Sequence, residues 1–214
     1  MVELERQIIT IRPPKLPAAP APAGTLDTTD GVLRGRLLES LRPAGDYTAL
    51  DVGGCVFERC VLTGAKLSGA SFSDTRFAGC DFSGVDLTGA GFVRCTFTGC
   101  KAVGARLVEG YFHDVLLEDC NFSLSNWDGA SIRALRMQKC GLRTANLTGC
   151  KLRAFDPGDA DLTEASFFGT PLAGVDLRRA CIDRLVVEGR ELAGAIVTEP
   201  QAAQLARLLG LVIR

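Results

Sequence analysis

The stretch GCDFSGVDLTGAGFVRCTFTGC, residues 79–100, repeats a pattern every five residues. Large apolar side chains recur at Phe82, Leu87, Phe92 and Phe97, and a Cys, Val or Ala stands two positions before each of them. An α-helix has a period of 3.6 residues and a flat strand a period of two, so neither explains this spacing. The stretch therefore predicts an internal repeat of five residues.

The same phase continues from Val52 to Leu192, and along it only Pro157 is not a typical core side chain at the large position. Glycine often stands two residues after the large side chain, where it suits a turn that needs a positive φ. One unit cannot bury its own large residue, so units must stack to build a continuous core. The pattern predicts a tube wound from short extended segments, with coils about 4.8 Å apart.

Several units resemble the pentapeptide-repeat family. They are CDFSG (80–84), VDLTG (85–89), ANLTG (145–149), ADLTE (160–164) and VDLRR (175–179). The resemblance covers roughly residues 50–196. It implies an all-β solenoid, a right-handed quadrilateral β-helix with four units per coil and about seven coils in this chain.

At twenty residues per coil, every twentieth residue falls in one column. Phe72, Phe92 and Phe112 should stack on one face, and Phe57, Phe77 and Phe97 on the next. The same rule places five cysteines along one inner corner: Cys60, Cys80, Cys100, Cys120 and Cys140.

The cysteine column is predicted to line the tube as buried, reduced thiols. Parallel Cβ vectors at coil spacing do not suit disulfides, and zinc needs four convergent ligands rather than a row. Reduced cysteine buries well as a small apolar residue. Only Cys181 falls in an outward register. This use of cysteine fits a reducing, cytoplasmic compartment.

The chain divides into four predicted segments. They are a Pro-rich N-terminal arm (1–30), an imperfect first coil or N-terminal cap (31–49), the pentapeptide-repeat β-helix (50–196) and a C-terminal capping or dimerisation helix (197–214). The arm contains RPPKLPAAPAPAG, which favours an extended polyproline-type conformation. A tail or linker is favoured over an arm that grips a partner.

The C-terminal segment has the signals of a short helix, with Thr198 as N-cap and Pro200 in the first turn. Its apolar residues exceed what one coil can easily cover, and in relatives that act on gyrase this segment forms a two-fold dimer. A homodimer is favoured over a monomeric cap. The candidate dimer interface consists of Ala202, Leu205, Leu208, Leu209, Leu211 and Ile213.

Composition excludes several classes of function. The 214 residues carry a formal charge of −1, so bulk charge favours neither nucleic acid nor an anionic membrane. The chain lacks a run of about 18 apolar residues, and the acids and short apolar stretch among its first residues predict no signal peptide. His113 is the single histidine and is predicted to point outward, and no P-loop, dinucleotide fingerprint or HExxH pattern occurs. We therefore expect neither enzyme activity nor a cofactor or metal.

Charged residues form two neighbouring bands that offer a candidate partner-binding surface. One band is acidic, with Asp114, Glu118, Asp119 and Asp128. The other is basic, with Arg133, Arg136, Lys139, Arg143, Lys151 and Arg153. Pairing of these charges in rungs between adjacent coils, each pair stabilising the surface weakly, is favoured over a binding site.

Two functions remain open. We favour a non-enzymatic protein-interaction rod that binds a protein partner through the charged bands or the arm. The resemblance implies the alternative, because some members of the family mimic B-form DNA, bind DNA gyrase and protect it from fluoroquinolones. Mimicry needs a negative surface. Residues 50–196 hold 18 acidic and 16 basic side chains, which leaves −2, so this chain is less acidic than such members, and its unbroken phase predicts no inserted loop.

Overall fold

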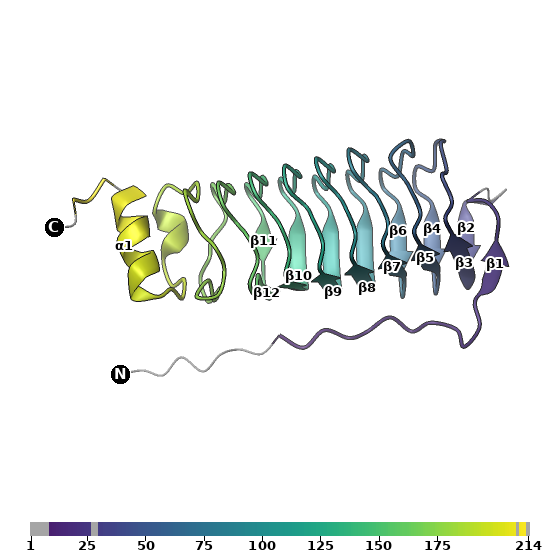
Figure 1. The fold of residues 1–214 in the computed structure, drawn as a ribbon, viewed down its shortest axis with the longest axis horizontal. Coiled ribbons are helices and arrows are strands. Elements are labelled where there is room, and N and C mark those ends of the chain that lie inside the picture. Colours follow the sequence, from purple (N-terminus) through teal and green to yellow (C-terminus); the bar gives the residue numbers. More distant parts are fainter. Residues whose placement is uncertain (1–8, 27–29, 209, 213–214) are drawn as a thin grey trace.

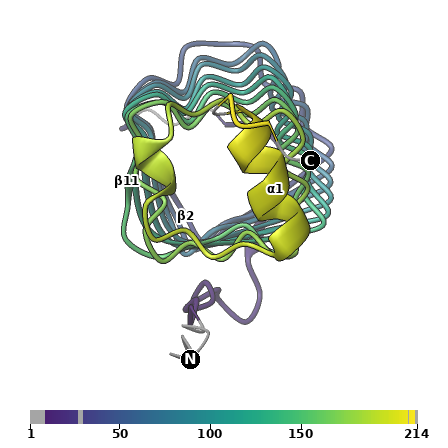
Figure 2. The same ribbon diagram turned by 90° about the vertical axis from the view of Figure 1, so that its left-hand side faces the viewer.

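The computed structural model describes residues 9–26, 30–208 and 210–212. Its strands wind into a four-sided tube, and successive turns stack along one axis (Figure 1 and Figure 2). The strands are β1 (Ala21–Ala23), β2 (Val32–Arg34), β3 (Arg36–Glu39), β4 (Asp51–Gly53), β5 (Val56–Glu58), β6 (Ser71–Ser73), β7 (Arg76–Ala78), β8 (Gly91–Thr98), β9 (Tyr111–Glu118), β10 (Ser131–Gln138), β11 (Lys151–Leu152) and β12 (Phe155–Asp156). A 3-10 turn, η1 (Arg190–Leu192), and one helix, α1 (Glu199–Leu208), follow.

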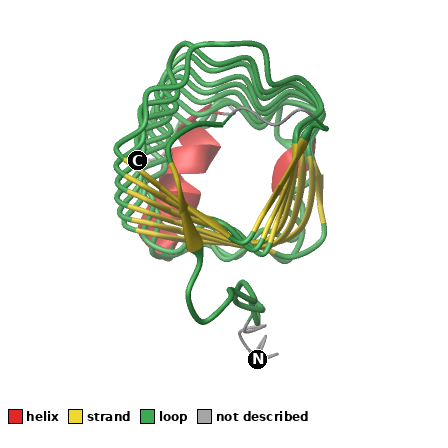
Figure 3. Cartoon of the chain, turned by 90° about the vertical axis from the view of Figure 1, so that its right-hand side faces the viewer, coloured by secondary structure: helices red, strands yellow, loops and turns green. Residues whose placement is uncertain are grey.

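The repeat of twenty residues per turn sets the pairing between turns. Phe72 pairs with Phe92, Phe92 with Phe112, and Phe112 with Ile132, each in parallel register. The strands occupy two adjoining faces, and turns and single bridges build the other faces (Figure 3). The predicted β-solenoid is therefore confirmed.

The large residue of each unit fills the tube. Phe92 is only 1% exposed, and its ring stacks on Phe72 at 5.1 Å and on Phe112 at 5.3 Å between centroids. Phe77 stacks on Phe57 at 5.0 Å and on Phe97 at 4.5 Å. Both predicted phenylalanine columns are confirmed, and they leave the interior packed with side chains.

The eight cysteines of the inward register are buried and free, and Cys181 is exposed, as predicted. Their thiols donate to backbone carbonyls, as Cys95 does to Phe72 at 3.4 Å. Burial raises the pKa of Cys95 to about 12, and that of Cys150 also to about 12. The thiols of Cys95 and Cys150 therefore stay protonated at neutral pH and serve as packing residues.

The two ends of the tube are built differently. At the N-terminal end β1 pairs with β3, and the step from Leu33 to Val52 is nineteen residues rather than twenty. At the other end Gln201 of α1 donates to the carbonyl oxygens of Leu177 and Ala180, at 2.7 and 3.0 Å. Among the described residues, α1 thus covers the C-terminal turn, whereas β1 and β2 are the terminal strands of the sheet at the other end.

The turn that contains Pro157 is irregular. Its pairing with β10 is limited to β11 and β12, two residues each. The next residue, Gly158, has φ +57°, and a Cβ atom there would lie 2.3 Å from the carbonyl oxygen of Met137. The backbone thus approaches the preceding turn so closely that only glycine fits.

Candidate interaction surface

The two predicted charged bands are joined to each other and to the following turn by ion pairs. Lys139 Nζ lies 4.0 Å from Asp119 Oδ1, and Arg143 Nη1 lies 3.0 Å from Asp161 Oδ2. Arg136 Nε lies 3.4 Å from Asp156 Oδ2. Most of these side chains face solvent, where each pair contributes little to stability. The pairs do, however, neutralise part of both bands.

Three cations of the basic band remain unpaired. Arg133, Lys151 and Arg153 are exposed, and none forms an ion pair within the described part of the chain. Register places Arg133 and Arg153 in one column, and the Arg133 guanidinium lies 6.0 Å from the centre of the Tyr111 ring. We call these three residues the basic patch.

The remaining acids of the predicted surface have different environments. Glu118 is half-buried and Asp128 is exposed, and neither takes part in an ion pair among the residues described. Asp114 was predicted to face solvent, but the structure buries it, with only 4% of its surface exposed. What covers Asp114 is the N-terminal arm.

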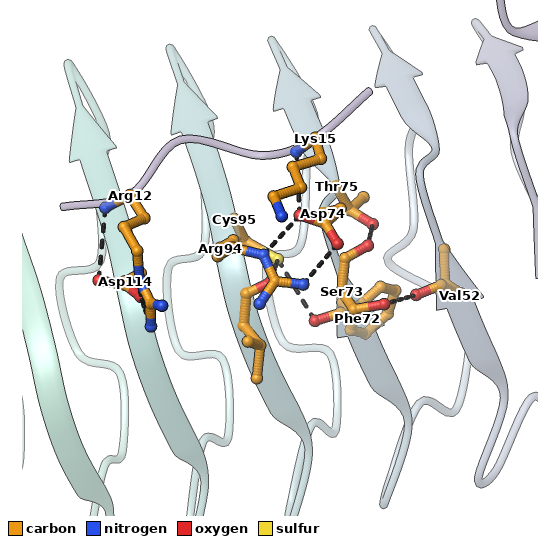
Figure 4. Close-up of polar contacts among 11 residues, drawn as sticks. Arg12, Lys15, Val52, Phe72, Ser73, Asp74, Thr75, Arg94, Cys95 and Asp114 are labelled. Carbon is orange, nitrogen blue, oxygen red and sulfur yellow. Dashed lines mark hydrogen bonds and ion pairs between the residues drawn. The ribbon is translucent and has the colours of Figure 1, made fainter. Parts of the chain in front are cut away.

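The arm, residues 9–20 of the structure, lies along the tube instead of extending away from it as a tail or linker (Figure 1). It follows the corner between the two strand faces (Figure 3). Arg12 Nε donates to Asp114 Oδ2 at 2.5 Å, and the Arg12 backbone N–H donates to Asp114 Oδ1 at 3.3 Å (Figure 4). Further along, the Lys15 backbone N–H donates to Asp74 Oδ1 at 2.9 Å.

The corner itself is built from residues with left-handed backbone conformation. Gly54, Asp74, Arg94 and Asp114 have φ values of 62°, 49°, 52° and 58°, and they occupy one column in successive turns. We call these four residues the corner track. Arg94 donates to both carboxylate oxygens of Asp74, at 2.6 and 2.5 Å. Together with the Lys15 N–H, these bonds hold the pKa of Asp74 below its usual value, so it is ionised at neutral pH.

Sequence reasoning missed the docking of the arm. Two features of the sequence could have indicated it. RPPK places the cations Arg12 and Lys15 three residues apart, and the acids Asp74 and Asp114 lie in the corner column two turns apart. The repeat places the two acids in one column, but the spacing of the two cations does not belong to the repeat, so the repeat gave no reason to connect the arm with that column.

The predicted dimer residues divide between the cap and the surface. Leu205 is buried and seals the last turn, whereas Ala202, Leu208 and Leu211 are exposed. Leu209 and Ile213 lie outside the described residues. Val212, at 83% exposure, adds an apolar side chain that the prediction did not include.

A hollow of about 440 Å³ lies beside the irregular turn at Pro157. Its charged lining has both signs: Arg136, Lys139, Asp156, Asp159 and Arg179. The described residues contain no group of three or more His, Cys, Asp or Glu placed to hold a metal ion. Within the same residues no helix has the length and apolar character needed to cross a membrane.

Comparison with known proteins agrees with the five-residue register. The family description "pentapeptide repeat region" matches residues 70–147, and "pentapeptide repeats (8 copies)" matches residues 140–181. This chain belongs to the pentapeptide-repeat family. No curated protein matches the sequence.

Two solved structures are similar to this chain at low identity. HetL, a protein involved in heterocyst differentiation regulation from the cyanobacterium Nostoc sp. strain PCC 7120, is 20% identical over 76% of this chain and 85% of its own, with a TM-score of 0.49. A trypsin-treated variant of QnrB1, a plasmid-mediated fluoroquinolone resistance protein, is 19% identical over 86% of this chain and 91% of its own, also with a TM-score of 0.49.

Proposed function

We propose that this pentapeptide-repeat protein is a non-enzymatic interaction rod that docks on an acidic surface of a partner protein. The observation that supports this best is the basic patch of Arg133, Lys151 and Arg153. These cations are exposed and without an ion pair in the described chain, although charges in the neighbouring turns are paired. Clustered cations that are not neutralised attract and orient an acidic partner.

The interior supports a binding role rather than catalysis. Stacked rings and buried thiols fill the tube, so substrate has no enclosed space there. The hollow beside Pro157 is lined by side chains of both signs, and its lining includes no Ser, Cys or His nucleophile. An extended exterior with regularly spaced side chains is instead suited to contact with another macromolecule.

The surface supports DNA mimicry of the gyrase substrate less well. A mimic needs rows of carboxylates that remain free to replace phosphates. Here many carboxylates pair with a cation one turn away, as Asp46 does with Lys66 and Glu164 with Arg184. We therefore rank modulation of gyrase below the interaction rod.

A homodimer through the C-terminal end is part of this proposal. Leu208, Leu211 and Val212 are 43%, 60% and 83% exposed, so apolar area remains at that end after Leu205 has sealed the tube. Two-fold contact between two such ends would cover this area.

The interaction rod can be tested by affinity capture of its partner from a cell lysate, without crosslinking, at increasing salt concentrations. We expect the unmodified chain to retain a specific partner whose capture weakens as salt rises, because exposed charges are screened. Reversal of the basic patch, with Arg133→Glu, Lys151→Glu and Arg153→Glu, should reduce the captured amount at least about tenfold, a loss of about 1.4 kcal/mol in binding.

The matched control reverses three other exposed cations that have no ion pair in the described chain: Arg42→Glu, Lys101→Glu and Arg106→Glu. This variant has the same net charge as the patch variant, so it should retain the partner if location matters. Equal capture by the patch variant and the unmodified chain would overturn the proposal.

A further inference from the structure

We infer that the corner track is a docking site for an extended proline-rich segment of a partner protein, and that the chain's own arm occupies this site in the free molecule. The inference concerns side chains other than the basic patch, so it stands independently of the proposed function. It rests on the backbone N–H groups that the arm donates, on the spacing of these donors, on the contact between Arg12 and Asp114, and on the absence of buried side chains in the arm.

Two carboxylates of the corner track accept hydrogen bonds from backbone N–H groups of the arm. Asp114 accepts the N–H of Arg12, and Asp74 accepts the N–H of Lys15. The two residues between them, Pro13 and Pro14, have no N–H to satisfy. A proline-rich segment therefore loses no hydrogen bond when it lies in this track, provided that a donor recurs every third residue.

The spacing of these donors matches the spacing of the turns. A polyproline-type chain has three residues per turn, so Arg12 and Lys15 face the same side and lie about 9.3 Å apart along the chain. Asp74 and Asp114 are two turns of the tube apart, about 9.6 Å at the ordinary distance between strands. An extended segment thus stays in register with the track across several turns.

Charge adds a preference for a cation at the first position. Arg12 Nε lies 2.5 Å from Asp114 Oδ2 and covers this carboxylate, which is 4% exposed. At the second position Arg94 orients Asp74, so the carboxylate is prepared to accept an N–H (Figure 4). The segment that fits carries an arginine and, three residues later, a residue other than proline.

The arm is held loosely enough to be replaced. None of its residues from 9 to 20 is buried, so it contributes no side chain to the core. Beyond the track its contacts include one from Arg136, which donates to the Ile9 carbonyl oxygen. Segments held by few polar contacts and little apolar burial open at low cost. A partner segment of the same chemistry can therefore compete with the arm.

The test uses the full-length chain and a fluorescently labelled probe peptide, PPRPPKPP, with anisotropy as the readout. The substitutions Arg12→Glu and Lys15→Glu place acids opposite Asp114 and Asp74 and should release the arm; we call this double mutant the released variant. This variant should bind the peptide at least about tenfold more tightly than the unmodified chain, in which the tethered arm competes at an effective concentration of about millimolar.

Two controls separate recognition by the track from general charge attraction. A peptide with the same composition but a two-residue spacing, PPRPKPPP, should bind the released variant about tenfold more weakly. Adding Asp114→Asn to that variant should weaken binding of PPRPPKPP by a similar factor. Absence of binding to a folded released variant, or binding that ignores both changes, would overturn the inference.

Hydrogen exchange of the unmodified chain provides a second measurement that does not depend on the variant folding. Excess PPRPPKPP should accelerate exchange of the Arg12 and Lys15 amides, and unchanged rates would contradict replacement of the arm. If the peptide instead converted a dimer into monomers, the natural occupant would be the arm of a second copy, and the assignment to a partner protein would be wrong.

Discussion

Replacing Phe92 by alanine should lower the free energy of unfolding by about 3–5 kcal/mol, as for other core aromatic residues. The ring is 1% exposed and stacks between Phe72 and Phe112. Its neighbours in the column are fixed by parallel strand pairing, so they cannot move in to fill the space. Equilibrium unfolding in urea, followed by circular dichroism, measures the loss.

Lys101→Ala is the matched control, because Lys101 is exposed and forms no ion pair in the described chain. We expect a change within about 0.5 kcal/mol. Arg94 is unsuitable as a control, although its outward register suggests a small effect, because it holds Asp74 beneath the arm. Equal losses for Phe92→Ala and Lys101→Ala would contradict the assignment of inner and outer faces.

Replacing Gly158 by alanine should cost roughly 2–5 kcal/mol, from overpacking and from a left-handed φ. The added Cβ would lie 2.3 Å from the Met137 carbonyl oxygen, a backbone atom that cannot rotate away, and Gly158 has φ +57°. The same urea titration measures the effect. We expect the two turns around Pro157 to separate locally in this variant.

Gly169→Ala isolates the contribution of the clash. Gly169 has φ +66°, close to that of Gly158, but no atom lies within 4 Å of the Cβ position. Its replacement should cost only about 1–2 kcal/mol for the left-handed conformation. If both variants lost the same stability, the close approach to Met137 would have no energetic importance.

The core was predictable because the large and small apolar positions of each five-residue unit indicate which side chains point into the tube. Phe92 and Cys100 could be placed inside from the five-residue phase alone, and the twenty-residue turn then fixed their columns. Repeated units contact only their neighbours, so local sequence determines tertiary packing in this fold. The N-cap of α1 could also be predicted from local sequence, and Thr198 Oγ1 accepts the N–H of Gln201 at 3.3 Å.

The contacts of the arm could not be predicted in this way. Arg12 and Asp114 are 102 residues apart, and their contact depends on where the chain enters β1 and on how far the extended segment before it reaches. No repeat links the two residues. The outward register of Asp114 was a fair inference for a bare tube, and a segment outside the repeat changed its exposure.

The most direct test of the interaction rod against DNA mimicry is a DNA gyrase supercoiling assay. Purified protein is added across micromolar concentrations, with and without a fluoroquinolone. We expect neither inhibition of gyrase nor rescue from the drug, because many of the carboxylates on this tube are paired with cations and form no phosphate-like row. Inhibition of supercoiling, or protection of gyrase from the drug, would contradict the interaction rod and place the protein among the DNA mimics.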